Sequence, residues 1–354
     1  MALKTQKFHK LRFFPLWPQL AVLAAALFVL AAAAAGMGYV NVGFIDVLRI
    51  AGSALPGMPE LASGIDQVSR AAVLEVRLPR ILTAALVGGA LGVSGAVYQG
   101  ILLNPLADPY TLGVSAGAAF GASIALLLNI GMLGAFSVPV FAFTGAVATL
   151  MIVMYLASSA GGYSSNNLIL SGIIVASILS AGISFLKYLA DERVSVIIFW
   201  LMGSLASKTW ADVGLVAGMT GFCTVVCLYF ARDLNLISLG TRTAASMGTP
   251  VHRISPALLV CVSLMAAICV SISGIIGFVG LLVPHLVRSV CGPDHARLIP
   301  LSLFTGAILL LGADTVTRAV LPSELPIGVL TALIGGPFFC WIFRRRQMGM
   351  GHGF

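Results

Sequence analysis

The sequence predicts an all-α polytopic membrane protein with about ten transmembrane helices. Only 9% of its 354 residues are charged and 59% are hydrophobic, and the mean hydropathy is +1.04. A soluble chain carries roughly a quarter charged residues, so this composition excludes a soluble fold of this size. The apolar residues also gather in runs of about 20, the length that a helix needs to cross a bilayer with its backbone hydrogen bonds satisfied internally.

Ten apolar runs meet this criterion, with the eighth shortened and interrupted by Pro284. They lie near residues 18–38, 81–103, 112–131, 138–158, 168–188, 211–231, 254–273, 275–291, 299–319 and 326–343. The run 194–206 is too short to cross and predicts a re-entrant or interfacial helix. We expect residues 1–17 and 344–354 to be tails and 18–343 to form the transmembrane domain.

The first run follows a basic segment and therefore also resembles a signal peptide. The segment contains Lys4, Lys7, Lys10 and Arg12. Because nine further apolar runs follow, insertion does not need a cleaved signal, and we interpret the run as an uncleaved first span.

Charge placement predicts the orientation. With the N-terminus inside, 12 Lys and Arg residues fall on the inner side and 8 on the outer side. The positive-inside rule therefore favours two cytoplasmic termini. The net charge of +8 is then an orientation signal; no basic domain is present that would bind nucleic acid.

A weak internal repeat relates the two halves of the chain. A shift of 179 residues aligns Ser94-Gly95 with Ser273-Gly274 and Pro105 with Pro284. Because this shift relates the second span to the seventh, the second copy would be inverted across the membrane, as transporter repeats often are.

The residues of energy-coupling chemistry are few. No phosphate-binding loop of the form GxxxxGK(S/T) occurs; the segment 203–209 lacks the second glycine. Asp314 lies one helical turn before Arg318, and we interpret the two as an ion pair within one helix, with a proton relay as the alternative. The cysteines show no spacing typical of a metal site, and for His285 and His295 we favour polar contacts to backbone at a helix end over haem ligation.

Two segments have constrained local structure. Arg77-Leu-Pro-Arg80 opens the second span on the outer side, and the proline-bounded turn 104–109 closes it on the inner side. The inner loop 234–248 predicts two short helices separated at Gly240, with Thr241 placed to cap the second. Such a platform suits docking of another protein; a helix lying on the lipid surface is the alternative, although only Arg242 would supply its basic face.

A third segment, 273–295, is rich in glycine and proline, and ELPIG follows at 324–328. Together these segments resemble the FecCD family of ABC-transporter permeases, which import iron–siderophore complexes, haem and cobalamin. The resemblance covers nearly the whole chain and rests on motifs that occur in order: RLPR (77–80), NPLADP (104–109), LGVSAGA (112–118), LGTRTAASMG (239–248), GFVGLLVPHLVR (277–288) and ELPIG (324–328).

The resemblance implies a type II ABC importer permease in the bacterial inner membrane. It implies two copies of this chain, two ATPase subunits that bind ATP and Mg, and a periplasmic or lipoprotein substrate-binding protein. This chain itself would bind no cofactor or metal and would catalyse no reaction.

Three sets of residues carry roles that the resemblance implies. The outer set would dock the binding protein: Arg77, Arg80 and Arg318. The coupling set, within a coupling loop at 234–253, would contact the ATPase: Leu239, Gly240, Thr241, Arg242, Ala245, Met247 and Gly248. The gate set would close the cytoplasmic side: Asn104, Leu106, Ser165 and Asn166. Thr241 departs from the glutamate that is usual in the family's coupling loop.

For the substrate we favour an iron chelate, either a siderophore complex or haem, and keep cobalamin as the alternative. An ion-driven secondary transporter that uses Asp314 and a polytopic membrane enzyme remain as rival functions.

Overall fold

The computed structural model describes residues 15–37, 42–54, 59–160, 162–319 and 324–350, and these residues form helices and connecting turns without a β-strand. The longer helices are α2 (Leu16–Gly36), α3 (Phe44–Ser53), α5 (Leu78–Ile101), α6 (Val114–Leu127), α7 (Ser137–Ser159), α8 (Ser165–Leu189), α10 (Trp210–Tyr229), α13 (Val251–Ser273), α14 (Val279–Cys291), α15 (His295–Ala319) and α16 (Ile327–Met350). The shorter ones are η1 (Pro59–Ala62), α4 (Gln67–Ala71), the π-helix η2 (Ala72–Arg77), η3 (Gly134–Phe136), η4 (Asp191–Arg193), α9 (Val194–Leu201), α11 (Ala231–Ile237) and α12 (Thr241–Ser246).

Each of the ten predicted spans coincides with a helix. Within the described parts of the chain, seven helices are long and apolar enough to cross a membrane, and α6, α14 and the apolar part of α16 are shorter apolar helices. The predicted short helix after the fifth span is α9, with only eight residues. Helix α16 continues to Met350, beyond the predicted end of the tenth span at residue 343.

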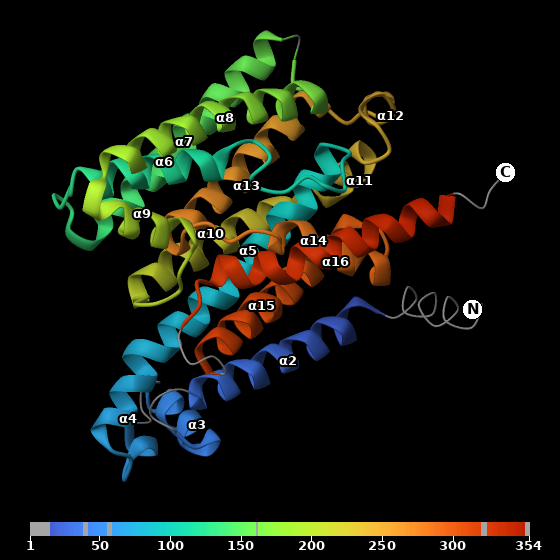
Figure 1. Ribbon diagram of the computed structural model, residues 1–354. Coiled ribbons are helices and arrows are strands. Elements are labelled where there is room, and N and C mark those ends of the chain that lie inside the picture. Colours follow the sequence, from blue (N-terminus) through green and yellow to red (C-terminus); the bar gives the residue numbers. More distant parts are fainter. Residues whose placement is uncertain (1–14, 38–41, 55–58, 161, 320–323, 351–354) are drawn as a thin grey trace.

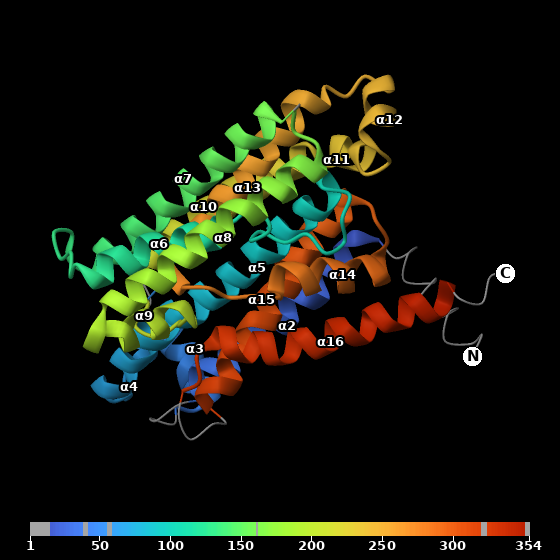
Figure 2. The ribbon, with the colours of Figure 1, turned by 45° about the horizontal axis from the view of Figure 1, so that its top comes forward.

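The long helices run side by side along one direction (Figures 1 and 2). One end of the bundle carries α3, α4 and α9. The opposite end carries α11 and α12 together with the beginning of α2 and the end of α16. Because both of these helix ends lie at one end, the described chain crosses the bundle an even number of times.

Helix α5 forms the centre of the bundle, and most of its 24 residues are buried. It approaches α15 at Gly88 and Gly306, where a Cβ on either glycine would lie within 3.0 Å of the other's carbonyl oxygen. Membrane helices use such small residues because no hydrophobic driving force draws helices together in lipid, and close backbone approach gains dispersion contacts instead.

Helices α13 and α14 are separated by an irregular segment, Gly274–Phe278. It begins and ends with left-handed backbone, at φ 69° for Gly274 and φ 66° for Phe278. Its carbonyls and flanks are hydrogen-bonded within the protein: Tyr110 Oη donates to Ile276 O at 2.7 Å, and Ser204 N donates to Ser273 O at 2.8 Å. Irregular backbone is tolerated inside a membrane protein where the protein itself satisfies it.

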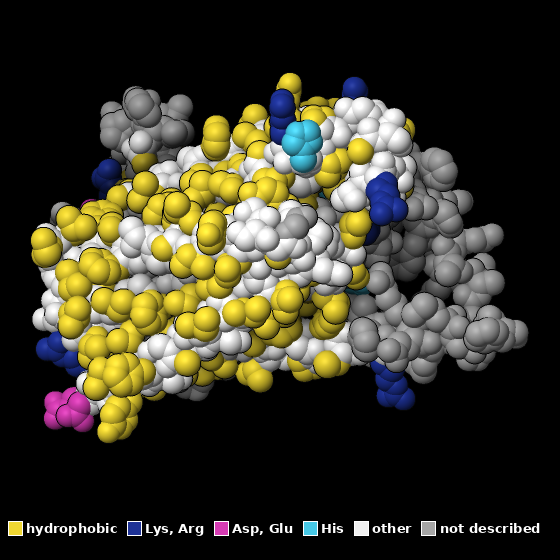
Figure 3. All heavy atoms as spheres, turned by 90° about the horizontal axis from the view of Figure 1, so that it is seen from above, with side chains coloured by type: hydrophobic (Ala, Val, Ile, Leu, Met, Phe, Trp, Pro, Cys, Tyr) yellow, Lys and Arg dark blue, Asp and Glu magenta, His cyan; other side chains and the backbone are white. Residues whose placement is uncertain are grey.

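Hydrophobic side chains cover the visible face in Figure 3, and Lys, Arg, Asp and Glu lie mainly toward its margins. Large exposed apolar residues such as Phe28, Ile178 and Phe222 lie midway along their helices. This distribution is the one that a hydrocarbon solvent selects.

The predicted internal repeat is matched in direction but not in register. Helices α5 and α13 run in opposite directions through the bundle (Figure 2). However, the 179-residue shift would place the turn with Pro105 onto Pro284, which lies inside α14. The two prolines therefore do not occupy equivalent positions in the two halves, and the repeat at this shift stays a prediction.

Candidate functional site

A buried charge cluster closes the end of the bundle that carries α3, α4 and α9. Arg80, on the first turn of α5, places Nη2 2.9 Å from Asp314 Oδ1 on α15. Its Nη1 lies 3.1 Å from Glu324 Oε1, just before α16. The Asp314 side chain is 1% exposed and that of Glu324 is 53% exposed. One guanidinium therefore connects three elements, with one carboxylate buried and the other facing solvent.

The predicted ion pair between Asp314 and Arg318 is wrong. Asp314 pairs with Arg80, which lies 234 residues away along the chain. Arg318 instead donates from Nη1 to Met37 O at 2.7 Å and from Nη2 to Ala34 O at 2.6 Å. Arg80 binds the buried carboxylate with two donor nitrogens, Nε and Nη2, in three hydrogen bonds of 2.9–3.1 Å. A guanidinium that approaches from another helix can present this fork to the carboxylate.

Arg77 also binds the end of α2, donating from Nη1 to Ala35 O at 2.7 Å. The last carbonyls of a helix have no partner within it and carry partial negative charge, so Arg77 and Arg318 act as cationic caps of α2. Since Arg77 is 7% and Arg80 is 9% exposed, a carboxylate of a partner protein would have to displace Glu324 to reach Arg80. The docking role of the outer set stays a prediction.

A cavity of about 560 Å³ lies between α9, α16 and the irregular segment 274–278. Met202, Ile275 and Gly328 line it, and the backbone of Gly328 donates to Met202 O at 3.0 Å. A Cβ on Gly328 would lie within 3.0 Å of the carbonyls of Met202 and Ile275. The sequence marks the ELPIG and 273–295 segments as constrained but gives no such signal for Met202. In the structure, the left-handed Gly203 that follows Met202 marks this turn.

Lys208, in the turn before α10, also holds the irregular region. Its Nζ donates to Ile272 O at 2.7 Å, at the end of α13. Burial lowers the pKa of this amine from its ordinary value, and the charge of Asp212 partly opposes that shift.

The coupling set lies on α12 and on the turns on either side of it, mostly exposed, at the opposite end of the bundle (Figure 1). Leu239 is 68% exposed and Met247 is 60% exposed. Leu234, Ile237 and Ala244 are buried beneath them. The loop is thus a packed platform that presents apolar side chains outward, rather than a flexible connection.

Two short helices separated at Gly240 are confirmed, but the predicted cap is wrong. Gly240 is itself the N-cap residue of α12, with φ 113°, and Thr241 is the first helical residue. No side chain caps this helix. The left-handed φ places the glycine at the break, so the hydroxyl of Thr241 begins one position too late to cap.

Asn235 fastens this platform to the bundle. Its Nδ2 donates to Asp294 Oδ1 at 2.8 Å, and its Oδ1 accepts from the backbone N of His295 at 2.8 Å. The His295 Nδ1 lies 2.8 Å from the same oxygen. His295 thus makes polar contacts at a helix end, but with the side-chain amide of Asn235 rather than with the backbone that the sequence led us to expect.

A cavity of about 360 Å³ joins the platform to the turn after α5. Asn104 of the gate set and Leu239 and Gly240 of the coupling set line it together. At its wall, Arg288 Nη1 donates to Gln99 Oε1 at 2.8 Å, which ties α14 to α5. The structure thereby brings one predicted gate residue next to the predicted coupling residues.

Of the other predicted gate residues, Leu106 contacts Asn104, whereas Ser165 and Asn166 lie on another element. Leu106 is 46% exposed and donates its N–H to Asn104 Oδ1 at 2.9 Å. Ser165 and Asn166 are the first two residues of α8, whereas Asn104 lies in the turn after α5. In that turn it is Asn167 that holds the backbone, donating to Ala160 O and Gly162 O at 3.0 Å each. The common gate predicted from the four residues stays a prediction.

The cysteines of α10 and α13 make helix contacts. Cys223 Sγ donates to Cys261 O at 3.3 Å. Across the part of the chain that the structure describes, no three His, Cys, Asp or Glu side chains gather to hold a metal ion.

Comparisons with known proteins agree with this architecture. The model of the FecCD transport family matches residues 23–345. The cobalamin import system permease protein BtuC of Halobacterium salinarum is 41% identical over 289 residues, covering 81% of this chain and 77% of the relative. The hemin transport system permease protein HmuU of Yersinia pestis is 39% identical over 284 residues, covering 78% and 85%.

A solved structure described as a metal-chelate type ABC transporter in an inward-facing conformation matches with a TM-score of 0.80. Its chain is 32% identical, and the match covers 92% of this chain and 98% of that one. The chain belongs to the FecCD transport family and is a permease subunit of an ABC importer.

Proposed function

We propose that two copies of this chain form the pathway of an importer for an iron chelate, with siderophore complexes and haem as the substrate class. Two separate ATPase subunits bind ATP and Mg at the end of the bundle that carries α11 and α12. A periplasmic or lipoprotein binding protein delivers the substrate at the opposite end. The assembly lies in the bacterial inner membrane, with both termini of each chain in the cytoplasm.

The observation that carries this proposal is the platform formed by α11 and α12. It exposes Leu239 and Met247 while its inner face is buried. Exposed apolar residues on a rigid, polar-rimmed element mark a protein interface. Because the platform shares a cavity with Asn104 and is held to α15 through Asn235, a movement imposed on it reaches both α5 and α15.

The mechanism follows from two features: helices that are packed rigidly together, and helices that irregular segments interrupt. ATP binding on the partner draws the two ATPase subunits together, and each platform moves with its subunit. Helix α5 transmits the movement because glycine contacts lock it to α15. The irregular segments at 202–205 and 274–278 interrupt the helices beside the cavity of Met202 and Ile275, and such interruptions absorb rigid-body rocking.

The substrate class is supported by the relatives, whose names include hemin and cobalamin transport, and by the metal-chelate transporter that shares the fold. Cobalamin is the alternative, since the cobalamin permease of Halobacterium salinarum is 41% identical. An apolar cavity with few ionisable groups suits a bulky chelate, whose metal charge is already neutralised by its own ligands.

The proposal includes docking of the binding protein at Arg77, Arg80 and Arg318. Glu324 is half-exposed and occupies Arg80 Nη1, so an acidic residue of the binding protein would take its place.

The experiment is uptake into proteoliposomes that contain the chain, its ATPase and its binding protein. A ferric siderophore, haem and cobalamin are offered separately and in competition. We expect uptake of an iron chelate that excess cobalamin does not reduce. Uptake of cobalamin alone would select the alternative, and uptake of none of the three would contradict the proposed substrate class.

A further inference from the structure

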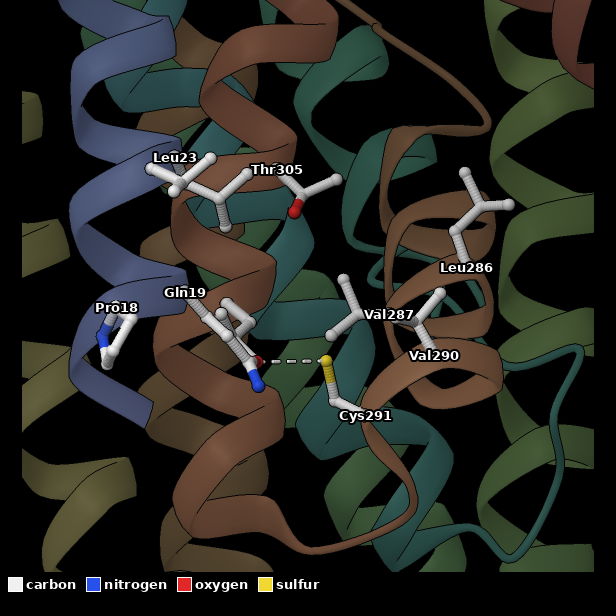
Figure 4. A pocket seen from close by; sticks show the side chains of 10 residues that line it. Pro18, Gln19, Leu23, Leu286, Val287, Val290, Cys291 and Thr305 are labelled. Atoms are coloured by element: carbon white, nitrogen blue, oxygen red, sulfur yellow. Dashed lines mark hydrogen bonds between the residues drawn. The ribbon is translucent and has the colours of Figure 1, made fainter. Parts of the chain in front are cut away.

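A deep apolar groove opens on the side of the bundle between α2, α14 and α15 (Figure 4). Its volume is about 530 Å³, within the range of cavities that hold small ligands. Val22 and Leu23 of α2, Val287 and Val290 of α14 and Leu301 of α15 form its walls. These walls are almost entirely apolar, which suits a hydrocarbon chain.

One end of the groove is polar. Cys291 Sγ donates to Gln19 Oε1 at 3.4 Å across the gap between α14 and α2 (Figure 4). Arg297 precedes the lining residues Leu301 and Thr305 by four and eight positions on α15, so the three share one helix face. Cys291 ends α14 and Arg297 lies in the first turn of α15, so only the short turn 292–294 separates the start of α15 from this polar end.

The polar end faces the side of the membrane where the coupling platform lies. Arg297 is in the first turn of α15, next to His295, whose backbone is hydrogen-bonded to Asn235 of α11. The apolar part of the groove continues from there toward the middle of the helices. The groove thus has the polarity of one leaflet, with a cation at the interface and hydrocarbon below it.

We propose that this groove binds one anionic phospholipid, with an acyl chain along Val22, Val287 and Val290 and the phosphate at Arg297 and the Gln19 amide. A guanidinium offers five N–H donors in a fork that suits a phosphate. The charge complementarity with Arg297 selects an anionic over a zwitterionic headgroup, since a basic side chain near the surface contributes about 1 kcal/mol toward anionic lipid. The bound lipid fastens α2 to α14 and α15 in the helix bundle.

The test uses the full chain, reconstituted into vesicles of equal phosphatidylglycerol and phosphatidylethanolamine, extracted in mild detergent and analysed by native mass spectrometry. We expect wild-type protein to retain phosphatidylglycerol over phosphatidylethanolamine. Arg297→Gln removes the cation and is expected to lower that preference at least about fivefold. Val290→Trp fills the groove and is expected to abolish retention of both lipids. Arg253→Gln and Val225→Trp, on exposed positions of α13 and α10, are the matched controls and are expected to retain lipid as wild type does.

Equal retention of the two lipids by wild-type protein would overturn the proposal, and so would unchanged retention in Arg297→Gln. If Val290→Trp does not fold, the Arg297→Gln comparison decides alone. Oleate added to delipidated protein distinguishes a free fatty acid: displacement of phosphatidylglycerol by equimolar oleate would show that the groove selects a carboxylate rather than a phospholipid. A shift from lipid-bound monomer to dimer in Val290→Trp would instead assign the groove to a second copy and contradict the lipid.

Discussion

Arg80 has an unusual position for a charged side chain in a membrane protein, because its two carboxylate partners lie in different environments. Asp314 is buried, so its charge depends on Arg80. Glu324 is half-exposed and can exchange the guanidinium for water. The pair with Asp314 therefore fixes α5 against α15, whereas the pair with Glu324 is the one that a partner can replace.

The first prediction concerns this buried pair. Asp314→Asn leaves Arg80 without its buried counter-charge, and we expect a loss of about 3 kcal/mol in the free energy of unfolding, because breaking a buried pair strands the remaining charge. Unfolding of the purified chain in mixed micelles by SDS titration measures it.

Asp46→Asn is the control, since Asp46 and Arg49 form an exposed pair at 3.7 Å that contributes less than about 1 kcal/mol. Replacing both Arg80 and Asp314 by Met and Leu is expected to restore most of the loss. Equal stability of Asp314→Asn and Asp46→Asn would show that Asp314 is not the partner of Arg80.

At the level of single residues, the sequence predicts which side chains are constrained but not their partners. RLPR was recognised as a fixed opening of the second span, yet the partner of Arg80 lies 234 residues away, and one sequence holds no distance information at that separation. The Thr241 cap failed for a local reason, because the left-handed Gly240 moves the start of α12 by one residue. Asn235 and Gln99 were missed because one polar side chain between apolar neighbours has no periodic signal. Asn167 was missed because it adjoins other polar residues, Ser165 and Asn166, from which the sequence does not distinguish it.

Among the elements, the contact between α5 and α15 decides whether a movement can be transmitted. Gly88→Ala would push a Cβ to within 3.0 Å of the Gly306 carbonyl. We expect a loss of about 1–3 kcal/mol, because backbone cannot move aside as a flexible side chain would.

Gly218→Ala is the matched control. Gly218 lies in α10 with no atom within 4 Å of an added Cβ, and alanine is the better helix former, so stability should stay equal or rise by up to about 1 kcal/mol. The SDS titration compares the two variants. A Gly88→Ala chain as stable as Gly218→Ala would refute close packing of α5 on α15.

The platform of α11 and α12 leads to a third prediction, about association. Leu239→Glu and Met247→Glu place charges on apolar positions that are exposed in the free chain. We expect the chain to keep its stability but to bind the ATPase at least about tenfold more weakly, as truncation or charging of a hot-spot side chain does. Affinity is measured with purified ATPase by surface plasmon resonance.

Met132→Glu serves as the control, since Met132 is 90% exposed in the turn before α7, at the far end of the bundle. Weakened binding in that control, or full binding in both platform variants, would contradict the assignment of the ATPase surface.

For the molecule as a whole, hydropathy was enough to predict ten helices, because the bilayer fixes the length of every spanning element and forbids other backbone structures. The same argument identified α9 as too short to cross. Hydropathy could not predict which helices pack against each other. Contacts such as that between Gly88 and Gly306 depend on the close fit of two backbones and not on hydrophobicity. The irregular segment 274–278 was not predicted for a related reason: its residues are as apolar as those of a spanning helix.

The orientation is the fourth prediction. In a chain without native cysteines, Met247→Cys is expected to react with a membrane-impermeant maleimide only in inside-out vesicles, and Met132→Cys only in right-side-out vesicles, because the inner side carries the excess of Lys and Arg. The reverse pattern would place both termini outside.

The central claim is that this permease moves its substrate with energy from separate ATPase subunits. The most direct measurement is substrate uptake into proteoliposomes containing the chain and its partners, with ATP, without ATP, and with an ATPase whose phosphate-loop lysine is replaced. We predict uptake above background only with ATP and the intact ATPase. Equal uptake without ATP, or with the lysine variant, would contradict the account.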